Sequence, residues 1–223
     1  ALRSAFTTDG QSIWLAGDNA SGGTTTGGLR YTTRGSASSF NLSQVQAPGG
    51  ARTPDNLRDV RAFDGQLYDC SGSDASVGKG FFAVGSGLPT SGPQMLSPRY
   101  NPDGAASTTA FYFIDADPGV PGVDVAYTVA SAGGQGLHKY IKTGSSLPWT
   151  ARGIVSFTGS EWITVAHQPG GPATIYIGGP DGIARIVDAD PRGSSVSGAI
   201  SPADYMITPE PGRPTNGPNG PNG

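Results

Sequence analysis

The order of apolar and polar residues along the chain predicts short β-strands joined by turns. Apolar residues alternate with polar ones, or gather in short runs, and clusters of glycine, proline and serine separate these segments. No stretch of about ten residues combines an apolar period of 3.6 with helix-capping residues. The pattern therefore predicts an all-β chain.

A repeated phrase organises these segments. Residues 2–11 and 57–66 both begin with Leu-Arg and turn at Asp-Gly-Gln, and Asp-Gly between apolar runs is a strong hairpin signal. A third copy is expected from Arg152, where RGIVSF leads through a Thr-Gly-Ser turn into EWITVAH. Gly10 and Gly65 are 55 residues apart, and Gly65 and Gly159 are 94 apart, which is twice 47. One divergent unit, expected at 109–130, therefore fits between them.

Each unit is expected to contain a hairpin, a third strand and usually a weaker fourth strand. The predicted third strands are GLRYTT, GFFAVGS, GLHKYIKT and GIARIVDA, and the predicted fourth strands are SFNLSQV, PQMLSP and LPWTA. Four four-stranded units of about 40–50 residues predict a β-propeller with blades at about 1–50, 51–100, 101–150 and 151–200. A β-sandwich is the alternative, but it does not account for the repeated phrase.

Four blades are compatible with two arrangements, a small closed ring or part of a larger or composite ring. An uncovered blade face would expose several hundred Å² of apolar surface, which at about 25 cal/mol/Å² costs about 10 kcal/mol. That cost is comparable to the stability of a whole domain. Unless the ring closes on itself, we expect self-association or a companion chain to complete the propeller.

Charge and hydropathy exclude two classes of partner. Charged residues make up 14% of the chain and the net charge is −3, so no basic stripe is available for a nucleic-acid backbone. No run of about eighteen apolar residues predicts a membrane span. We therefore expect neither nucleic acid nor a membrane span.

Several features favour an extracellular bacterial surface protein. Lysine is scarce, Ser, Thr and Gly are abundant, and the C-terminal tail is rich in Gly, Pro and Asn. Residues 1–20 show no signal-peptide pattern in this form of the chain. Asn19 and Asn41 begin tripeptides that match the glycosylation acceptor pattern. The single cysteine, Cys70, cannot form an internal disulfide, and we expect a buried thiol rather than a reactive one.

The C-terminal segment, residues 201–223, is predicted to be an extended tail rich in Pro, Gly and Asn. From about residue 215 its glycines recur every third position, as in collagen, where only glycine fits at the crowded axis. A plain flexible linker is the alternative. The residues expected to serve as an assembly tail are Gly217, Pro218, Asn219, Gly220, Pro221, Asn222 and Gly223.

Several phrases carry a resemblance to a known family. LRSAFTTDGQSIWLAG, NLRDVRAFDGQLYDCSGS, FFAVGSGLPTSG, FYFIDADPGVPGVDVAY and WTARGIVSF look like the C-terminal half of a family of secreted bacterial propeller-like proteins of unassigned function. The resemblance covers residues 2–190. It implies a seven-bladed type of fold and an extracellular location, but no activity. The chain departs from the family by lacking the N-terminal half.

Three arginines are candidate ligand-binding residues. Arg3, Arg58 and Arg152 open three units at the same phase, so they are expected on innermost strands facing a central channel. There they could hold an anionic ligand or a glycan with several guanidinium groups. The alternative is that each arginine pairs with a carboxylate of a neighbouring blade.

A calcium site is a second candidate. Asp115 and Asp117 occupy positions 1 and 3 of a turn, and Asp124 could add a third hard oxygen ligand. However, the position where an EF-hand-type loop carries a bidentate glutamate is Ala126. Asx-turns before proline explain the same phrase without a metal.

Nothing in the sequence predicts a catalytic centre. The two histidines, His138 and His167, lie outside HExxH, and no GxSxG elbow or zinc-type Cys/His cluster is present. The three tryptophans could stack on sugars or fill blade cores. We therefore expect a non-enzymatic structural protein, a propeller on a Gly-Pro-Asn repeat that forms a surface fibre, filament or sheath. A glycan- or anion-binding propeller is the alternative.

Overall fold

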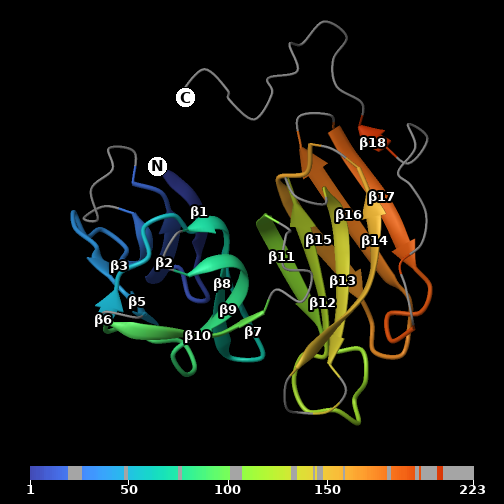
Figure 1. Cartoon of the computed structure of the whole chain (residues 1–223), viewed down its shortest axis with the longest axis horizontal. Helices are drawn as coiled ribbons and strands as arrows, with labels where there is room; N and C mark the ends of the chain where they lie inside the picture. The colour runs from blue at the N-terminus through green and yellow to red at the C-terminus, as the bar shows by residue number, and fades with distance from the viewer. Residues whose placement is uncertain are drawn as a thin grey trace, which may run out of the picture.

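The structure is a computed structural model, and it confirms the predicted β-propeller. It describes residues 1–19, 27–47, 50–74, 77–100, 107–131, 135–142, 144, 148–157, 159–179, 182–193, 196 and 205–207. The described elements are all β-strands, and they form four sheets arranged as the blades of a four-bladed propeller (Figure 1). None of the described residues forms a helix that could cross a membrane.

Each blade has four antiparallel strands that follow chain order from the innermost outward, and the sheet of blade 2 also carries β5 and β6 at its outer edge. Blade 1 consists of β1 (Leu2–Phe6), β2 (Ser12–Gly17), β3 (Gly28–Thr33) and β4 (Phe40–Asn41). Blade 2 contains β7 (Val60–Phe63), β8 (Gln66–Asp74), β9 (Gly78–Val84) and β10 (Gln94–Tyr100). Blade 3 consists of β11 (Thr108–Ile114), β12 (Val125–Ala130), β13 (Gly136–Lys142) and β14 (Trp149–Ser156). Blade 4 consists of β15 (Trp162–His167), β16 (Ala173–Gly179), β17 (Gly182–Asp188) and β18 (Tyr205–Ile207).

Both predicted Asp-Gly hairpins form. In blade 2, Phe63 pairs with Gln66, and the two turn residues Asp64 and Gly65 have φ of 48° and 71°, as a two-residue turn requires. The predicted third strands are also confirmed, as β3, β9, β13 and β17. In blade 2, local turn chemistry therefore sets the register of the inner hairpin.

The predicted third copy at RGIVSF is wrong. These residues lie in β14, which pairs with β13, and they form no hairpin with β15. Trp149 is buried between blades 2 and 3 and Val155 is buried against blade 4. The single strand Trp149–Ser156 therefore contains residues that were predicted to belong to two different blades. The first strand of blade 4 is consequently EWITVAH, starting at Trp162.

The predicted fourth strand SFNLSQV is divided between two blades. Phe40–Asn41 completes blade 1, whereas β5 (Ser43–Ala47) runs parallel to β10 at the edge of blade 2 and continues into β6 (Gly50–Arg52). The side-chain oxygen of Asn41 accepts a hydrogen bond from the Ser43 N–H at 2.8 Å, which turns the chain at this point. Leu42, fully buried between the two sheets, anchors the crossing.

Three apolar clusters join successive blades. One lies between blades 1 and 2 around Trp14 and Phe82, one between blades 2 and 3 around Phe81 and Phe113, and one between blades 3 and 4 around Ile175. Within the described part of the chain, no such cluster joins blade 4 to blade 1. Blades 1 and 4 therefore each have one face that no other blade covers.

The predicted C-terminal tail falls almost entirely outside the described residues. Its exception is β18, which pairs with β17 as the outermost strand of blade 4. The glycine-proline-asparagine triplets from Gly217 to Gly223 lie outside the described residues. Their collagen-like role stays a prediction.

Candidate functional site in the central cavity

The innermost strands of the four blades, with the residues just before β7 and β15, line an open cavity of about 580 Å³. Every blade contributes to its lining, which consists of Arg3–Phe6 from blade 1, Arg58–Phe63 from blade 2, Thr109, Ala110 and Tyr112 from blade 3, and Glu161 and Trp162 from blade 4. Cavities of this size commonly hold small ligands. The charged side chains of the lining decide what the cavity can bind.

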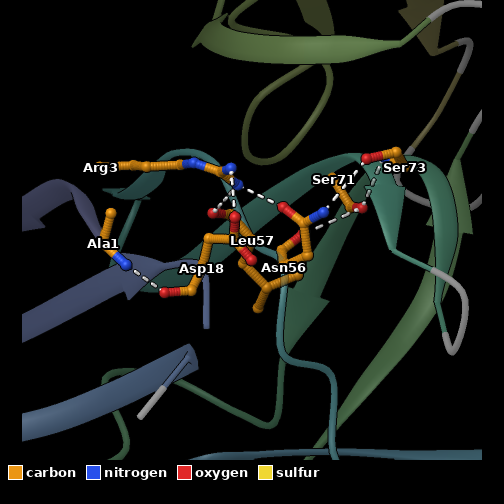
Figure 2. A network of polar contacts seen from close by, with 7 residues as sticks. All are labelled: Ala1, Arg3, Asp18, Asn56, Leu57, Ser71 and Ser73. Atoms are coloured by element: carbon orange, nitrogen blue, oxygen red, sulfur yellow. Dashed lines mark hydrogen bonds and ion pairs between the residues drawn. The ribbon is translucent and has the colours of Figure 1, made fainter. Parts of the chain in front are cut away.

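Arg3 is committed to a network that links blades 1 and 2 (Figure 2). Its Nη2 lies 2.9 Å from the Asp18 carboxylate, and its Nη1 donates to the Asn56 side-chain oxygen and to the Leu57 carbonyl. Asn56 in turn donates to the Ser73 hydroxyl. Arg3 is therefore paired with a carboxylate, but Asp18 follows β2 of the same blade, whereas the alternative expected a carboxylate of a neighbouring blade.

A second ion pair lies deeper in the same wall. The Arg61 Nε is 2.8 Å from the carboxylate of Asp59, and the guanidinium lies 5.6 Å from the centre of the Tyr112 ring. The Asp59 carboxylate also accepts a 3.4 Å hydrogen bond from the Phe111 N–H of blade 3. Burial raises the pKa of Asp59, and the Arg61 charge opposes that shift.

Arg58 is different from its neighbours because no described residue pairs with its guanidinium. Its backbone N–H donates to the Cys70 carbonyl at 2.8 Å, which fixes the residue at the start of blade 2. Its Nε is buried without a hydrogen bond, and no described residue forms an ion pair with its side chain. Burial, followed by the positive charge of Arg58, lowers the pKa of Arg3. Two guanidinium groups thus lie near each other with only one carboxylate, Asp18, paired to them.

Arg152 does not line the cavity, so the expectation for this residue was wrong. It lies on β14, the outermost strand of blade 3. The expectation failed because the repeat alignment was shifted by one strand at this point. Its Nε is also buried without a hydrogen bond. Of the three predicted arginines, the cavity brings together only Arg3 and Arg58.

The blade 4 wall holds two residues that the sequence analysis did not single out as ligands. Glu161 is exposed, and its side chain forms no ion pair or hydrogen bond with a described residue. Trp162 is 40% exposed and its ring lies directly on Gly178, where any side chain would collide with it. The repeat alignment assigned EWITVAH to a second strand instead of the first strand of blade 4, so it placed neither residue at the cavity.

Two of the three aspartates of the predicted calcium site, Asp117 and Asp124, pair with an arginine. The Arg192 guanidinium lies 2.9 Å from Asp124 and 3.3 Å from Asp117, while Asp115 is exposed. Burial raises the pKa of Asp124, and the bonds to Ala116 N–H and Arg192 oppose the shift. Among the described residues, no three acidic, histidine or cysteine side chains are grouped to hold a metal. Calcium would have to compete with the Arg192 guanidinium here.

The predicted glycosylation residues are both inaccessible in the folded chain. The side-chain nitrogens of Asn19 and Asn41 are buried, and the Asn41 oxygen is used in the turn that starts β5. Attachment of a glycan would require these nitrogens to be exposed. Glycosylation stays a prediction for a state in which they are accessible.

The remaining candidates belong to the core. Trp14 and Trp149 are buried between blades, and the Trp14 ring nitrogen donates to the Pro89 carbonyl at 2.8 Å. Cys70 is fully buried between blades 2 and 3, and burial raises the pKa of its thiol well above its ordinary value. The expectation of a buried thiol at this position is confirmed.

Comparisons with other proteins do not assign the chain to a family. A scan against known protein families and a search of curated proteins each found no match. The resemblance to secreted propeller-like proteins therefore stays an expectation. Function is inferred below from the cavity and from the blade faces.

Proposed function

We propose that the protein is a non-enzymatic extracellular structural protein that assembles through the uncovered faces of blades 1 and 4. Copies of the chain would join into a surface fibre, filament or sheath. The observation that supports this proposal is the alternating burial along β15, in which Ile163 and Val165 are buried and their neighbours are exposed. A terminal blade in an incomplete circle of blades is expected to have this pattern.

The uncovered face of blade 4 is a mixed apolar and polar sheet surface. Cross-strand pairing places Trp162, Thr164 and Ala166 of β15 on the same face as Arg185 and Val187 of β17. All five residues are exposed, and Val187 is 48% exposed. Large side chains on such a face favour contact with another sheet.

The uncovered face of blade 1 has a different shape. Leu2 is 66% exposed, and pairing places it on the same face as Leu15 and Arg30. These residues line a hollow of about 530 Å³. Because the two faces differ, a contact between blade 4 of one copy and blade 1 of the next is heterologous. Contacts of this kind produce closed rings or continuous filaments.

The oligomeric mass in solution tests the proposal. We expect light scattering after size exclusion to give a mass above 22.6 kDa that grows with concentration. Val187→Glu places a charge on the uncovered face of blade 4 and should shift the mass toward the monomer. Ile154→Glu is the matched control, because Ile154 is 45% exposed on blade 3 and its replacement should leave the mass unchanged. A monomer at every concentration would refute assembly.

A second variant separates the blade faces from the predicted tail. A chain that ends at Ile207 retains β18 but lacks the Gly-Pro-Asn triplets. If the blade faces drive assembly, this shortened chain should still associate, and Val187→Glu should still prevent it. Loss of association on shortening alone would assign assembly to the tail, and rescue only by a companion protein would assign it to a hetero-complex.

A further inference from the structure

The cavity contains one positive and one negative side chain without a partner. Arg3 is paired with Asp18, and Arg61 is paired with Asp59. Arg58 and Glu161 line the same cavity, and neither side chain forms an ion pair or hydrogen bond with a described residue. The internal ion pairs therefore leave opposite charges on opposite walls, Arg58 on blade 2 and Glu161 on blade 4.

An unpartnered guanidinium is costly for a protein to retain. Buried donors in folded proteins are nearly always satisfied, and the exceptions call for a ligand, a water molecule or an ion. The Arg58 Nε is buried, and the nearby Arg3 charge repels any further positive charge. A carboxylate in the cavity cannot reach the buried Nε, but it can pair with the Nη groups of Arg58 and offset the repulsion between the two arginines.

Charge balance restricts which anion fits. Lining and adjoining groups provide three guanidinium groups, from Arg3, Arg58 and Arg61, and three carboxylates, from Asp18, Asp59 and Glu161. A polyanion would meet Glu161 without a cation to neutralise it. A ligand that carries its own positive charge would instead pair with Glu161.

Aromatic rings complete the cavity wall. The Tyr112 ring lies below the Arg61 guanidinium, and the Trp162 ring is held against Gly178 next to Glu161. Both residues line the cavity. Rings of this kind provide a flat apolar surface for the body of a small ligand and also favour a cation above their faces.

We propose that the central cavity binds a small zwitterion, with its carboxylate on Arg58, its ammonium group on Glu161 and its apolar body along Trp162 and Tyr112. This role is independent of assembly, because the uncovered blade faces and the interior of the cavity are separate surfaces except at Trp162. Failure of either proposal leaves the other intact.

Three ligands with the same phenylalkyl body test the proposal by isothermal titration calorimetry. Phenylalanine is the zwitterion, 3-phenylpropionate lacks the ammonium group, and 2-phenylethylamine lacks the carboxylate. We expect phenylalanine to bind at least about tenfold more tightly than either analogue, because each charged group adds a charge-assisted hydrogen bond. Equal binding of all three, or no heat with any of them at millimolar concentration, overturns the proposal.

Two variants test which residue binds the carboxylate of the ligand and which binds its ammonium group. Arg58→Gln should remove the advantage of phenylalanine over 2-phenylethylamine, and Glu161→Gln should remove its advantage over 3-phenylpropionate. The second effect should be the smaller one, since Glu161 is exposed to water whereas the Arg58 Nε is buried. A loss that is the same for every ligand in both variants would contradict the assigned orientation.

Thermal unfolding tests whether Arg58 stabilises the fold instead of binding a ligand. Because no described residue pairs with the Arg58 side chain, Arg58→Gln should leave the unfolding midpoint unchanged or raise it. Arg3→Gln is the control and should lower the midpoint, because it breaks the pair with Asp18. A lower midpoint for Arg58→Gln would show that Arg58 stabilises the fold, and the proposal would then be withdrawn.

Discussion

Blades 3 and 4 have the same four-stranded topology but very different surfaces. Every residue of β12 is buried, as is every residue of β13 except Lys142, whereas burial alternates along β15. Blade 3 lies between two other blades, and blade 4 is covered by blade 3 alone among the described residues. Position in the circle of blades, rather than strand chemistry, therefore decides which faces are buried.

The position of a blade also determines which polar residues it can bury. Blade 3 buries Lys139 completely, and its Nζ lies 2.6 Å from the carboxylate of Asp188 on blade 4. The Tyr127 hydroxyl donates to the same carboxylate at 2.7 Å, and Lys139 also donates to the Asp190 carbonyl. An interior blade can therefore carry a lysine only because its neighbour provides the partner.

Breaking this buried pair should have the largest effect. Lys139→Met leaves Asp188 charged and buried, so we expect the free energy of unfolding in urea to fall by about 3–5 kcal/mol. Adding Asp188→Leu to the same chain should recover a large part of the loss, because the unpaired charge is removed. A double variant no more stable than Lys139→Met would contradict this account.

Truncations on the innermost strands compare the two blades directly. On β11, Phe113 packs toward blade 2 and its neighbour Ile114 packs toward blade 4, so alanine at either position should cost about 2–5 kcal/mol. On β15, Ile163→Ala should cost a similar amount, but Thr164→Ala should stay within about 0.5 kcal/mol. Urea denaturation of the four variants measures these values.

The value for Thr164→Ala tests whether the outer face of blade 4 is exposed in solution. A cost above about 1 kcal/mol for Thr164→Ala would mean that another surface covers blade 4 in solution. Repeating the measurement at several protein concentrations would then show whether that surface belongs to a second copy. A cost that rises with concentration would support assembly.

Much of the fold was predictable because it depends on local signals. The Asp64–Gly65 turn requires positive φ, and a blade of three regular strands follows from the apolar runs next to it. The break between β14 and β15 was not predictable, because RGIVSF resembles a first strand and only the burial of Trp149 and Val155 places it in blade 3. Similar local patterns can lie in different strands of a blade, because long-range packing decides which strand a segment forms.

The candidate site was predictable only in part. Leu-Arg at the start of blades 1 and 2 correctly placed Arg3 and Arg58 at the cavity. Their different states depend on Asp18 and Asn56, which reach Arg3 but not Arg58 from other parts of the chain. Glu161 was missed because its role depends on where blade 4 begins. Partners distant in sequence leave no local pattern.

The smallest predicted effect concerns equivalent acidic residues in blades 2 and 4. Asp59 and Glu161 each precede the first strand of their blade, but Asp59 is buried by blade 3 and Glu161 is exposed. Burial raises the pKa of Asp59 above its ordinary value of 3.8, so the folded chain binds this proton more tightly than the unfolded chain. The stabilising contribution is complete below the unfolded pKa and is lost as the pH rises through the folded pKa.

Acidification should therefore favour the natural chain over Asp59→Asn, which cannot titrate at this position. As the pH falls from neutral toward 3.8, the free energy of unfolding of the natural chain should rise relative to that of the variant. Arg61→Gln should steepen this dependence, because the Arg61 charge opposes the shift. Urea denaturation across the pH range measures both differences. A relative loss of stability on acidification would show that the pair with Arg61 outweighs the burial of Asp59 by blade 3.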